Sequence, residues 1–482
     1  GFTQLGRIGY ALSGGPGGTG GRINTDFIDN SAGVDTSDHE VNIKILLGQV
    51  MRDGALDLPA RDELLRSMTD EVAADVLRDN YEQNVLLGNA RAQQRIMLPV
   101  HMRFIRYLEE HGGLNRELEF LPSETELGDR LAAGTGLVSP EFSVLVAYSK
   151  LTLKRDLLAS GFPDDPWLES ELRGYFPPAL PERFPEAVAE HPLRRDIIVT
   201  GVANDIVNRG GITFAYRATE ETGASGEQIA RAYVIAKEIF GVADYLDRVE
   251  ALDNVVSTQQ QTELYLEVRR LLDRAVRWFI TARPSTLDIG SEIERYQPII
   301  GAWRPRLGEL LVGSERERLE EATAARVAEG VPEDLARDCA SLLDAFSLLD
   351  IADICIDKDL DPAVVAPLYY LNSERLGVDK LLGKITQLQR EDHWEALARG
   401  ALRDDLYGIL DAITRAVLDG APAGEQDPDK LLDGWLTAHS ETVQRAQRSL
   451  AGIDRLDQPT IAALSVALRT LRSVVRAGAS EG

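Results

Sequence analysis

The clearest helical segment of the sequence begins with Ser139-Pro140-Glu141 and continues through Val144, Leu145, Tyr148, Leu151 and Leu158, which recur at near-helical spacing. Ser139 is a residue type that caps helices. Pro140 suits the first helical position, because the N–H that proline lacks would have no partner there. We therefore predict a helix that starts at this Ser-Pro-Glu sequence.

The same pattern extends over most of the chain outside this helix. Thr69-Asp70-Glu71 begins another amphipathic segment, with a capping residue and two acids in its first turn. Prolines interrupt the pattern at 162–166 and at 175–178, because proline removes a backbone donor and disfavours helix at the preceding residue. One apolar stripe is formed by Leu264, Val268, Leu271, Leu272, Ala275, Val276 and Phe279. The sequence predicts a mainly α fold in which helices pack on helices.

Length and composition suggest three parts. At 482 residues the chain has room for roughly three domains of about 150 residues each, and 44% hydrophobic residues are enough for packed cores. Residues 1–55 differ from the rest because they are rich in Gly, Asn, Asp and Thr. We predict a division into 1–55, a helical region at 56–254 and a C-terminal helical bundle at 255–482, with a polar loop at 421–425.

The charge balance argues against several classes of partner. The chain has 78 acidic and 52 basic residues, and its formal net charge of −26 repels nucleic acid and anionic membranes. No run of about 18 apolar residues occurs, and no basic and apolar signal sequence stands at the start. We expect a cytoplasmic protein that binds neither nucleic acid nor membrane.

The residues that usually hold metal ions are sparse. Cys339 and Cys355 lie in apolar surroundings, so we expect both thiols to be buried rather than to form a disulfide or a zinc site. The six histidines are scattered, and none has a second ligand at i+4 or a companion Cys-x-x-Cys. The sequence predicts no metal site.

Three further clusters are interpreted as structural. Gly15-Pro16-Gly17-Gly18-Thr19-Gly20 matches G-x-G-x-x-G, but it follows the helix-like residues 5–12 instead of a buried strand, so we predict a flexible loop. Arg194-Arg195 is interpreted as solvated surface instead of a phosphate site. Asn204, Asp205, Asn208 and Arg209 precede Gly210-Gly211 and are expected to cap and end a helix, with a polar cluster against the catalytic domain as the alternative.

The segment 22–40 reads as a turn followed by a helix. Ser37 and, three residues later, Glu40 match a capping box, in which both side chains satisfy backbone donors at a helix start. A functional interpretation is also open. Ser31-Ala32-Gly33 leaves the backbone accessible, and a hydroxyl beside a helix N-terminus can bind a carboxylate. Both interpretations can hold together.

The stretch Asn30-Ser31-Ala32-Gly33-Val34-Asp35-Thr36-Ser37-Asp38-His39-Glu40 resembles the N-A-G-G-V-x-x-S-x-x-E motif of glutamate dehydrogenases without a gap. In that family the serine contacts the side-chain carboxylate of glutamate and the valine walls the same pocket. The resemblance implies a substrate-binding role for Ser37 and Val34, with Gly33 and Asn30 beside them. The departure is Ala32, where the small enzymes of the family have glycine.

Longer agreement is similar to the large NAD-specific branch of the family. It includes Ile23-Asn24-Thr25-Asp26, Asp35 to Lys44, Met68 to Val72, Arg78-Asp79-Asn80-Tyr81, Ala147-Tyr148-Ser149-Lys150 and Ala203 to Phe214, and so covers nearly the whole chain. The resemblance implies the last segment of an α/β, Rossmann-like dinucleotide-binding catalytic domain, followed by a helical C-terminal portion. It also implies that Thr3 and Gln4 lie near the NAD cofactor.

The resemblance implies oxidation of L-glutamate by NAD and water to 2-oxoglutarate, ammonium and NADH, with a lysine and an aspartate moving protons. Those residues and the dinucleotide fingerprint are expected upstream, so we predict no catalytic residue here and an inactive fragment. The helical region would serve assembly or regulation, in a homo-oligomer, expected to be a tetramer. The alternative is a non-catalytic helical interaction or scaffold protein with a dehydrogenase remnant. The intact Val34 and Ser37 favour the first interpretation.

Overall fold

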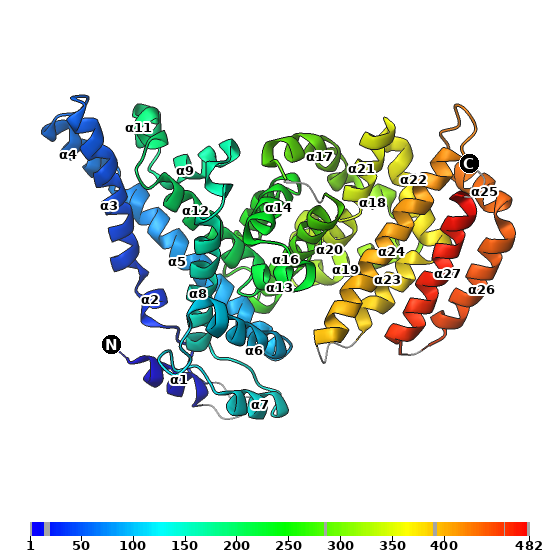
Figure 1. The fold of residues 1–482 in the computed structure, drawn as a ribbon, viewed down its shortest axis with the longest axis horizontal. Helices are drawn as coiled ribbons and strands as arrows, with labels where there is room; N and C mark the ends of the chain where they lie inside the picture. Colours follow the sequence, from blue (N-terminus) through cyan, green and yellow to red (C-terminus); the bar gives the residue numbers. More distant parts are fainter. Residues whose placement is uncertain (1, 14–19, 284–286, 389–392, 457, 480–482) are drawn as a thin grey trace. The chain divides into compact units, whose positions relative to one another are not determined.

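The computed structural model describes residues 2–13, 20–283, 287–388, 393–456 and 458–479. These residues form helices and helical turns, and none of them forms a β-strand, as Figure 1 shows. The prediction of a mainly α chain is therefore confirmed. The chain divides into two compact units, one made of residues 1–234 and 276–290 and the other of residues 235–275 and 291–482. The three-part division drawn from the sequence stays a prediction.

The first unit contains the elements that carry the candidate site. Its helices are α1 (Gln4–Leu12), α2 (Asp26–Asp29), α3 (Ser31–Arg52), α4 (Leu58–Ser67), α5 (Thr69–Ala92), α6 (Leu98–Tyr107), α7 (Glu124–Ala132), α8 (Ser139–Leu158), α9 (Glu169–Tyr175), α10 (Ala179–Arg183), α11 (Pro185–Ala189), α12 (Arg194–Asp205), α13 (Phe214–Thr222) and most of α14 (Gly226–Ile239). Two π-helical turns follow α6 and α12, namely η1 (Leu108–Gly112) and η4 (Ile206–Gly210). The 3-10 turns η2 (Phe162–Asp164) and η3 (Pro166–Leu168) fall in a predicted proline break.

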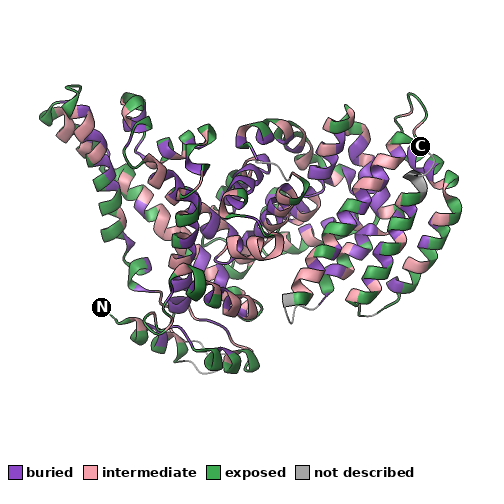
Figure 2. Cartoon of the chain, in the orientation of Figure 1, coloured by how far each residue is buried: buried purple, intermediate pink, exposed green. Residues whose placement is uncertain are grey.

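The core of this unit forms where α5, α6 and α8 meet. Figure 2 colours the buried parts of these helices purple. The core includes Leu86, Phe104, Phe142 and Leu145, each at most 2% exposed. Burial of apolar side chains of this size is the main stabilising contribution to such a fold. The core fixes α5 and α8, and both helices carry residues of the site described below.

The predicted helix at the Ser-Pro-Glu sequence is confirmed as α8, but its cap differs from the prediction. Val138 is the N-cap residue, and Glu141 accepts a hydrogen bond from the Val138 N–H at 2.8 Å. The Ser139 hydroxyl instead accepts a hydrogen bond from Arg91 at 3.1 Å. A long-range partner therefore occupies the side chain that the local pattern assigned to capping.

The start of α5 shows a similar small difference. Asp70 and Glu71 lie in its first turn, as predicted, but Met68 holds the N-cap position and Thr69 is the first helical residue. The Thr69 hydroxyl donates back to the carbonyl of Arg66 at 3.2 Å. Thr69 therefore links α4 to α5 and does not cap α5.

Two polar clusters form ion pairs and hydrogen bonds with distant side chains that the sequence did not predict. Arg194 and Arg195 lie half-buried near the surface, and both pair with Asp164, so they are not simply solvated. The helix α12 does end before Gly211, which has a φ of 111°, as predicted. Asn208 and Arg209 also bind Glu82 on α5, a long-range contact that the capping interpretation did not include.

The second unit contains the remaining helices. They are α15 (Val242–Glu250), most of α16 (Thr258–Ala282), α17 (Ile289–Trp303), α18 (Leu307–Leu310), α19 (Gly313–Ala328), α20 (Glu333–Ala345), α21 (Leu348–Lys358), α22 (Pro362–Leu376), α23 (Val378–Gln387), α24 (His393–Asp419), α25 (Pro428–Ala438), α26 (Ser440–Asp454) and α27 (Ile461–Ala479), with a 3-10 turn η5 (Arg304–Arg306). In Figure 1, α23, α24, α27 and α26 lie side by side in the yellow to red part of the chain, which confirms a C-terminal helical bundle.

Several local predictions in the second half are confirmed. Every residue of the predicted α16 stripe is buried, and Cys339 and Cys355 are buried free thiols. The loop predicted at 421–425 lies between α24 and α25.

The glycine-rich motif at 15–20 falls outside the described residues except for Gly20, although the helix expected before it is present as α1. None of the described helices is long and apolar enough to cross a membrane.

Candidate functional site

The helix α3 carries the residues predicted to bind substrate, but it begins earlier than the sequence suggested. Asn30 is the N-cap residue and Ser31 the first helical residue, so Ser37 lies inside the helix. Glu40 forms an ion pair with Lys44 one turn further on. The predicted capping box of Ser37 and Glu40 is therefore wrong. The sequence suggested a turn through Ser31-Ala32-Gly33, but these residues belong to α3. The turn before the helix therefore lies at Asn30.

The early start of α3 is explained by hydrogen bonds to α5. The Asn80 side-chain amide donates to the carbonyl of Ile28 at 2.8 Å and to the Ser31 hydroxyl at 2.9 Å. One turn away, Asn24 donates to Asn84 at 2.9 Å. These amide contacts hold the first turn of α3 against α5, and they come from two segments that resemble the large dehydrogenase branch.

One face of α3 is open to solvent. Val34 is 77% exposed, and Ser37 and Gly33 are exposed on the same helix. Val34 and Ser37 are three residues apart, so their side chains lie next to each other on the helix surface. Asn30 makes no side-chain capping hydrogen bond to the first turn. The backbone donors of that turn are therefore not satisfied by a side-chain cap.

Thr3 and Gln4 lie at the start of α1. The Thr3 hydroxyl accepts a hydrogen bond from the Gly6 N–H at 3.1 Å and so caps that helix. The Gln4 side-chain amide donates to the carbonyl of Pro140 at 2.9 Å, which ties α1 to the beginning of α8. Both side chains have structural partners here.

The inner side of α3 presents a second set of polar residues. Asp35 and His39 are one turn apart and face Asp79 on α5. One ring nitrogen of His39 and one carboxylate oxygen of each aspartate all lie within 4.8 Å of one another. His39 is only 4% exposed, and its ring stacks on that of Tyr175 with centroids 4.7 Å apart. Sequence reasoning missed this group, whose three residues, two aspartates and a histidine, are of types that ligate metals.

The two aspartates hold protons unusually tightly. Burial first, then the negative charges of Asp79 and Asp38, raise the pKa of Asp35 to about 7, and the two carboxyl groups share a hydrogen bond. Burial and the charge of Glu82 also raise the pKa of Asp79. Like charges at this separation cannot both ionise freely, so near neutral pH the pair shares a proton.

Lys150 on α8 adds a cation to the same region. Burial lowers the pKa of Lys150 to about 8, although attraction to Asp79, Glu82 and Asp35 opposes that shift. A lysine and a carboxyl group with pKa values brought close to neutrality are frequent at functional sites. Lys150 belongs to the Ala147-Tyr148-Ser149-Lys150 segment, so the fold brings another of the quoted motifs to this cluster.

Glu82 connects the cluster to the end of α12. It accepts hydrogen bonds from Arg209 at 2.6 Å, from Arg78 at 2.7 Å and from Asn208 at 3.2 Å. The π-helical turn η4 carries Asn208 and Arg209 toward α5. Three sequence segments that lie far apart in the chain, those of α3, α8 and η4, therefore meet around α5.

One signal for this cluster was available in the sequence. Asp35 and His39 are four residues apart, which places both on one side of a helix. A pattern that requires a second histidine or a Cys-x-x-Cys motif does not include this pair. Asp79 could not have been assigned, because its approach to α3 depends on the packing of α5.

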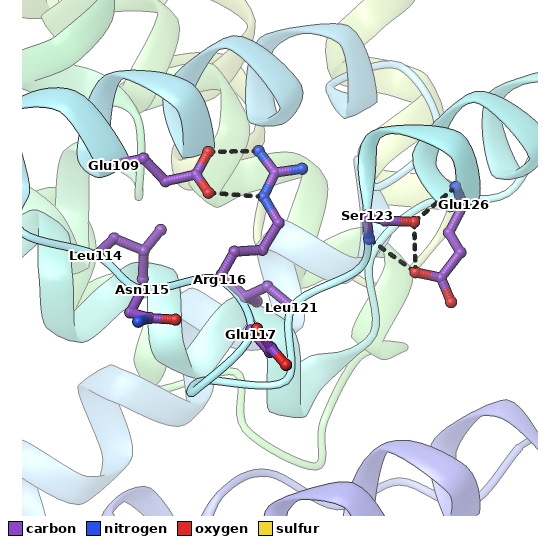
Figure 3. A pocket seen from close by; sticks show the side chains of 8 residues that line it. All are labelled: Glu109, Leu114, Asn115, Arg116, Glu117, Leu121, Ser123 and Glu126. Carbon is purple, nitrogen blue, oxygen red and sulfur yellow. Dashed lines mark hydrogen bonds and ion pairs between the residues drawn. The ribbon is translucent and has the colours of Figure 1, made fainter.

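A surface pocket of about 490 Å³ elsewhere in this unit is a weaker candidate. Figure 3 shows Arg116 paired with both oxygens of Glu109, at 3.0 and 2.6 Å, and Ser123 and Glu126 joined in a capping box. These polar side chains already stabilise the loop and the start of α7. Their arrangement explains the local fold without a ligand.

Comparison with known proteins places the chain in a family. A family model described as the C-terminal part of glutamate dehydrogenase matches residues 134–473, and one described as the catalytic domain of bacterial NAD-glutamate dehydrogenase matches residues 1–90. The chain is 44% identical over 476 residues to an NAD-specific glutamate dehydrogenase of Mycobacterium tuberculosis. It is 40% identical to one of Pseudomonas aeruginosa and 39% identical to one of Halomonas elongata.

These alignments cover 98–99% of the chain but only 29% of each relative, so the chain spans less than a third of the length of the curated relatives it matches. The two family models together match most of the length of the chain. The chain therefore belongs to the bacterial NAD-specific glutamate dehydrogenases, and it corresponds to their C-terminal portion.

Proposed function

We propose that this chain is the C-terminal part of a cytoplasmic enzyme that oxidises L-glutamate with NAD and water to 2-oxoglutarate, ammonium and NADH. The observation that carries this proposal is the 39–44% identity, over nearly the whole chain, to three NAD-specific glutamate dehydrogenases. In this proposal residues 1–55 are the end of the α/β catalytic domain. The remaining helices support assembly or regulation of a homo-oligomer, expected to be a tetramer.

The substrate pocket is proposed to include Ser37, Val34, Gly33 and Asn30. Exposure of a valine side chain at 77% is unfavourable in water and suits a pocket wall completed by another part of the enzyme. The first turn of α3 lacks a side-chain cap, and its backbone donors together with the helix dipole favour an anionic group such as a carboxylate. The Ser37 hydroxyl lies on the same exposed face.

The cofactor is proposed to be NAD, with Thr3 and Gln4 near it. The contact of Gln4 with Pro140 fixes the start of α1 relative to α8. Several large apolar side chains of α1, α2 and α3, and of the residue Phe2 just before α1, are exposed: Phe2, Leu5, Tyr10, Phe27, Val34 and Val41. An apolar surface of this kind suits burial against the rest of the enzyme.

The test is steady-state glutamate oxidation by the full-length protein with Ser37→Ala. Loss of one hydrogen bond to a charged carboxylate costs about 1.5–3 kcal/mol, so we expect the KM for glutamate to rise roughly 10-fold to 100-fold. Thr36→Ala, at the neighbouring exposed position of α3, is the matched control and should leave KM unchanged.

Two results would count against this assignment. If Ser37→Ala and Thr36→Ala give the same KM as the native enzyme, Ser37 does not contact the substrate. If the native full-length protein shows no glutamate-dependent reduction of NAD, the non-catalytic helical interaction protein becomes the better interpretation.

A further inference from the structure

The group formed by Asp35, His39 and Asp79 has the composition of a metal site. It offers one imidazole nitrogen and two carboxylate oxygens, and these atoms lie within 4.8 Å of one another. Ligand atoms that share a Zn²⁺ ion at about 2.0–2.2 Å are separated by roughly 3.5 Å, so modest side-chain movements would complete the geometry. Two of the residues are held on one helix and the third on the helix beside it.

Two buried polar atoms in this group have no partner among the described residues. They are Nδ1 of His39 and Oδ2 of Asp35. His39 is 96% buried, since only 4% of its surface is exposed, and a ring nitrogen of this histidine is one of the three converging atoms. A buried polar atom without a hydrogen bond costs about 1–3 kcal/mol, so native structures usually supply a partner.

The surroundings hold the histidine ring in place. Tyr175 stacks on His39 with an interplanar angle of 13°, and the Tyr175 hydroxyl donates to Asp38 at 2.9 Å. Asn42 in turn donates to the Tyr175 hydroxyl at 2.8 Å. Such contacts fix the orientation of a ligand and reduce the entropy lost when a metal binds.

The charges around the group favour a cation. Asp38, Asp75 and Glu82 add negative charge to that of Asp35 and Asp79, while Lys150, Arg78 and Arg209 bring positive charge. Arg78 and Arg209 are both bound to Glu82. Lys150 is therefore the cation that a metal ion would compete with at Asp35 and Asp79.

We propose that Asp35, His39 and Asp79 bind a divalent first-row transition-metal ion, with Zn²⁺ as the representative, and that water completes its coordination. Imidazole and carboxylate ligands suit this class of ion, whereas the nitrogen ligand disfavours Mg²⁺ and Ca²⁺. The ion clamps α3 to α5 behind the exposed face that carries Val34 and Ser37. This inference does not depend on the proposed enzymatic function.

The experiment measures binding of Zn²⁺ alone to the full-length protein after treatment with a chelator. Titration calorimetry of the native protein is compared with His39→Gln and Asp79→Asn, and each variant should weaken one Zn²⁺ site by at least about 10-fold. The matched control is His111→Gln, which changes an exposed histidine of the same unit and should have no effect.

The variant Lys150→Met tests metal binding directly, because its expected result would not follow if Asp35, His39 and Asp79 had only a structural role. Removing the competing cation should strengthen Zn²⁺ binding at this site by several-fold, because less positive charge then opposes the ion. Circular dichroism and thermal melting check that each variant is folded. Loading the native protein with Co²⁺ adds a spectroscopic measurement that needs no variant.

The outcomes separate clearly. A site lost in His39→Gln, kept in His111→Gln and tightened in Lys150→Met supports the proposal. Equal Zn²⁺ affinity in the native protein and in His39→Gln would overturn it. If the variants do not fold, Co²⁺ absorption and paramagnetically shifted imidazole signals from the native protein decide the matter, and their absence rejects the site. None of these measurements requires glutamate oxidation.

Discussion

Glu315 lies in the first turn of α19, with only 5% of its surface exposed. Ser373 donates a hydrogen bond to one of its carboxylate oxygens at 3.1 Å, and the other oxygen has no partner among the described residues. Burial, followed by the charges of Asp344 and Asp379, raises the pKa of Glu315 to about 8. The folded state therefore binds this proton more tightly than the unfolded chain does.

The raised pKa predicts a pH-dependent effect of Glu315→Gln. The stability that the proton contributes is fully present below the usual value of 4.5 and is lost as pH rises through about 8. We expect native and variant chains to be similarly stable near pH 4.5. Near pH 9 the variant should be more stable by a few kcal/mol, since each pKa unit is worth about 1.4 kcal/mol.

Urea unfolding at the two pH values measures this difference. Glu317→Gln, at an exposed position of the same helix, is the control and should shift stability by less than about 0.5 kcal/mol at either pH. A constant difference between native and Glu315→Gln chains across this range would show that Glu315 is not protonated in the folded state.

At the level of single residues, local spacing predicted some features and missed others. Val34 and Ser37 share a helix face wherever the helix begins, so their relation followed from the sequence alone. The cap was misassigned because the bonds from Asn80 to Ile28 and Ser31, far apart in sequence, set the start of α3. The sequence also did not show that Asp35 lies beside Asp79, because that contact depends on the packing of α3 against α5.

Among the elements, the junction of α7 and α8 depends on one buried ion pair. Arg130 contacts both carboxylate oxygens of Glu141, at 2.7 and 2.8 Å, and the Glu141 side chain is only 1% exposed. We predict that Arg130→Met destabilises the chain by about 3–5 kcal/mol, because it leaves a buried carboxylate without its cation. Chemical denaturation provides the measurement.

The control for this prediction lies one loop away. Arg116 also pairs with two acids, but Glu109 and Glu124 are 34% and 49% exposed. Water screens such a pair, so Arg116→Met should cost no more than about 1 kcal/mol. Equal losses for the two variants would contradict the importance of burial at Glu141.

Element prediction succeeded where the signal is periodic and local. The α8 helix and the buried stripe of α16 follow directly from apolar spacing. The π-helical turn η4 could not be foreseen, because its residues Asn208 and Arg209 are held by Glu82 from another helix. Local spacing placed these residues at a helix end but did not reveal their long-range contact with Glu82.

For the whole molecule, the net charge of −26 is the dominant electrostatic property. Self-repulsion weakens a compact state, and salt shortens its range from about 30 Å at 0.01 M to about 8 Å at 0.15 M. We expect the melting temperature of the chain to rise as NaCl increases over this range, as measured by thermal unfolding at pH 7. A falling melting temperature would mean that the ion pairs contribute more than the repulsion removes.

The helical architecture as a whole was predictable, since apolar periodicity and proline breaks recur along the chain. What the sequence alone did not provide is the convergence of distant segments on α5. The segments containing Asp35, Asp79, Lys150 and Arg209 were recognised separately, each by its resemblance to one enzyme branch. Only the packing of α3, α8 and η4 around α5 shows that they form one cluster.

The π-helical turn η4 also bears on which insertions and deletions this chain can tolerate. Each residue of a regular helix turns the chain by about 100°, and the wider turn at Ile206–Gly210 shifts that phase within a single turn. Removing one residue there would restore ordinary helix and swing Arg209 away from Glu82. Descendants of this sequence should therefore keep the length of the segment 206–210 unchanged, because any change in length would break the contact between Arg209 and Glu82.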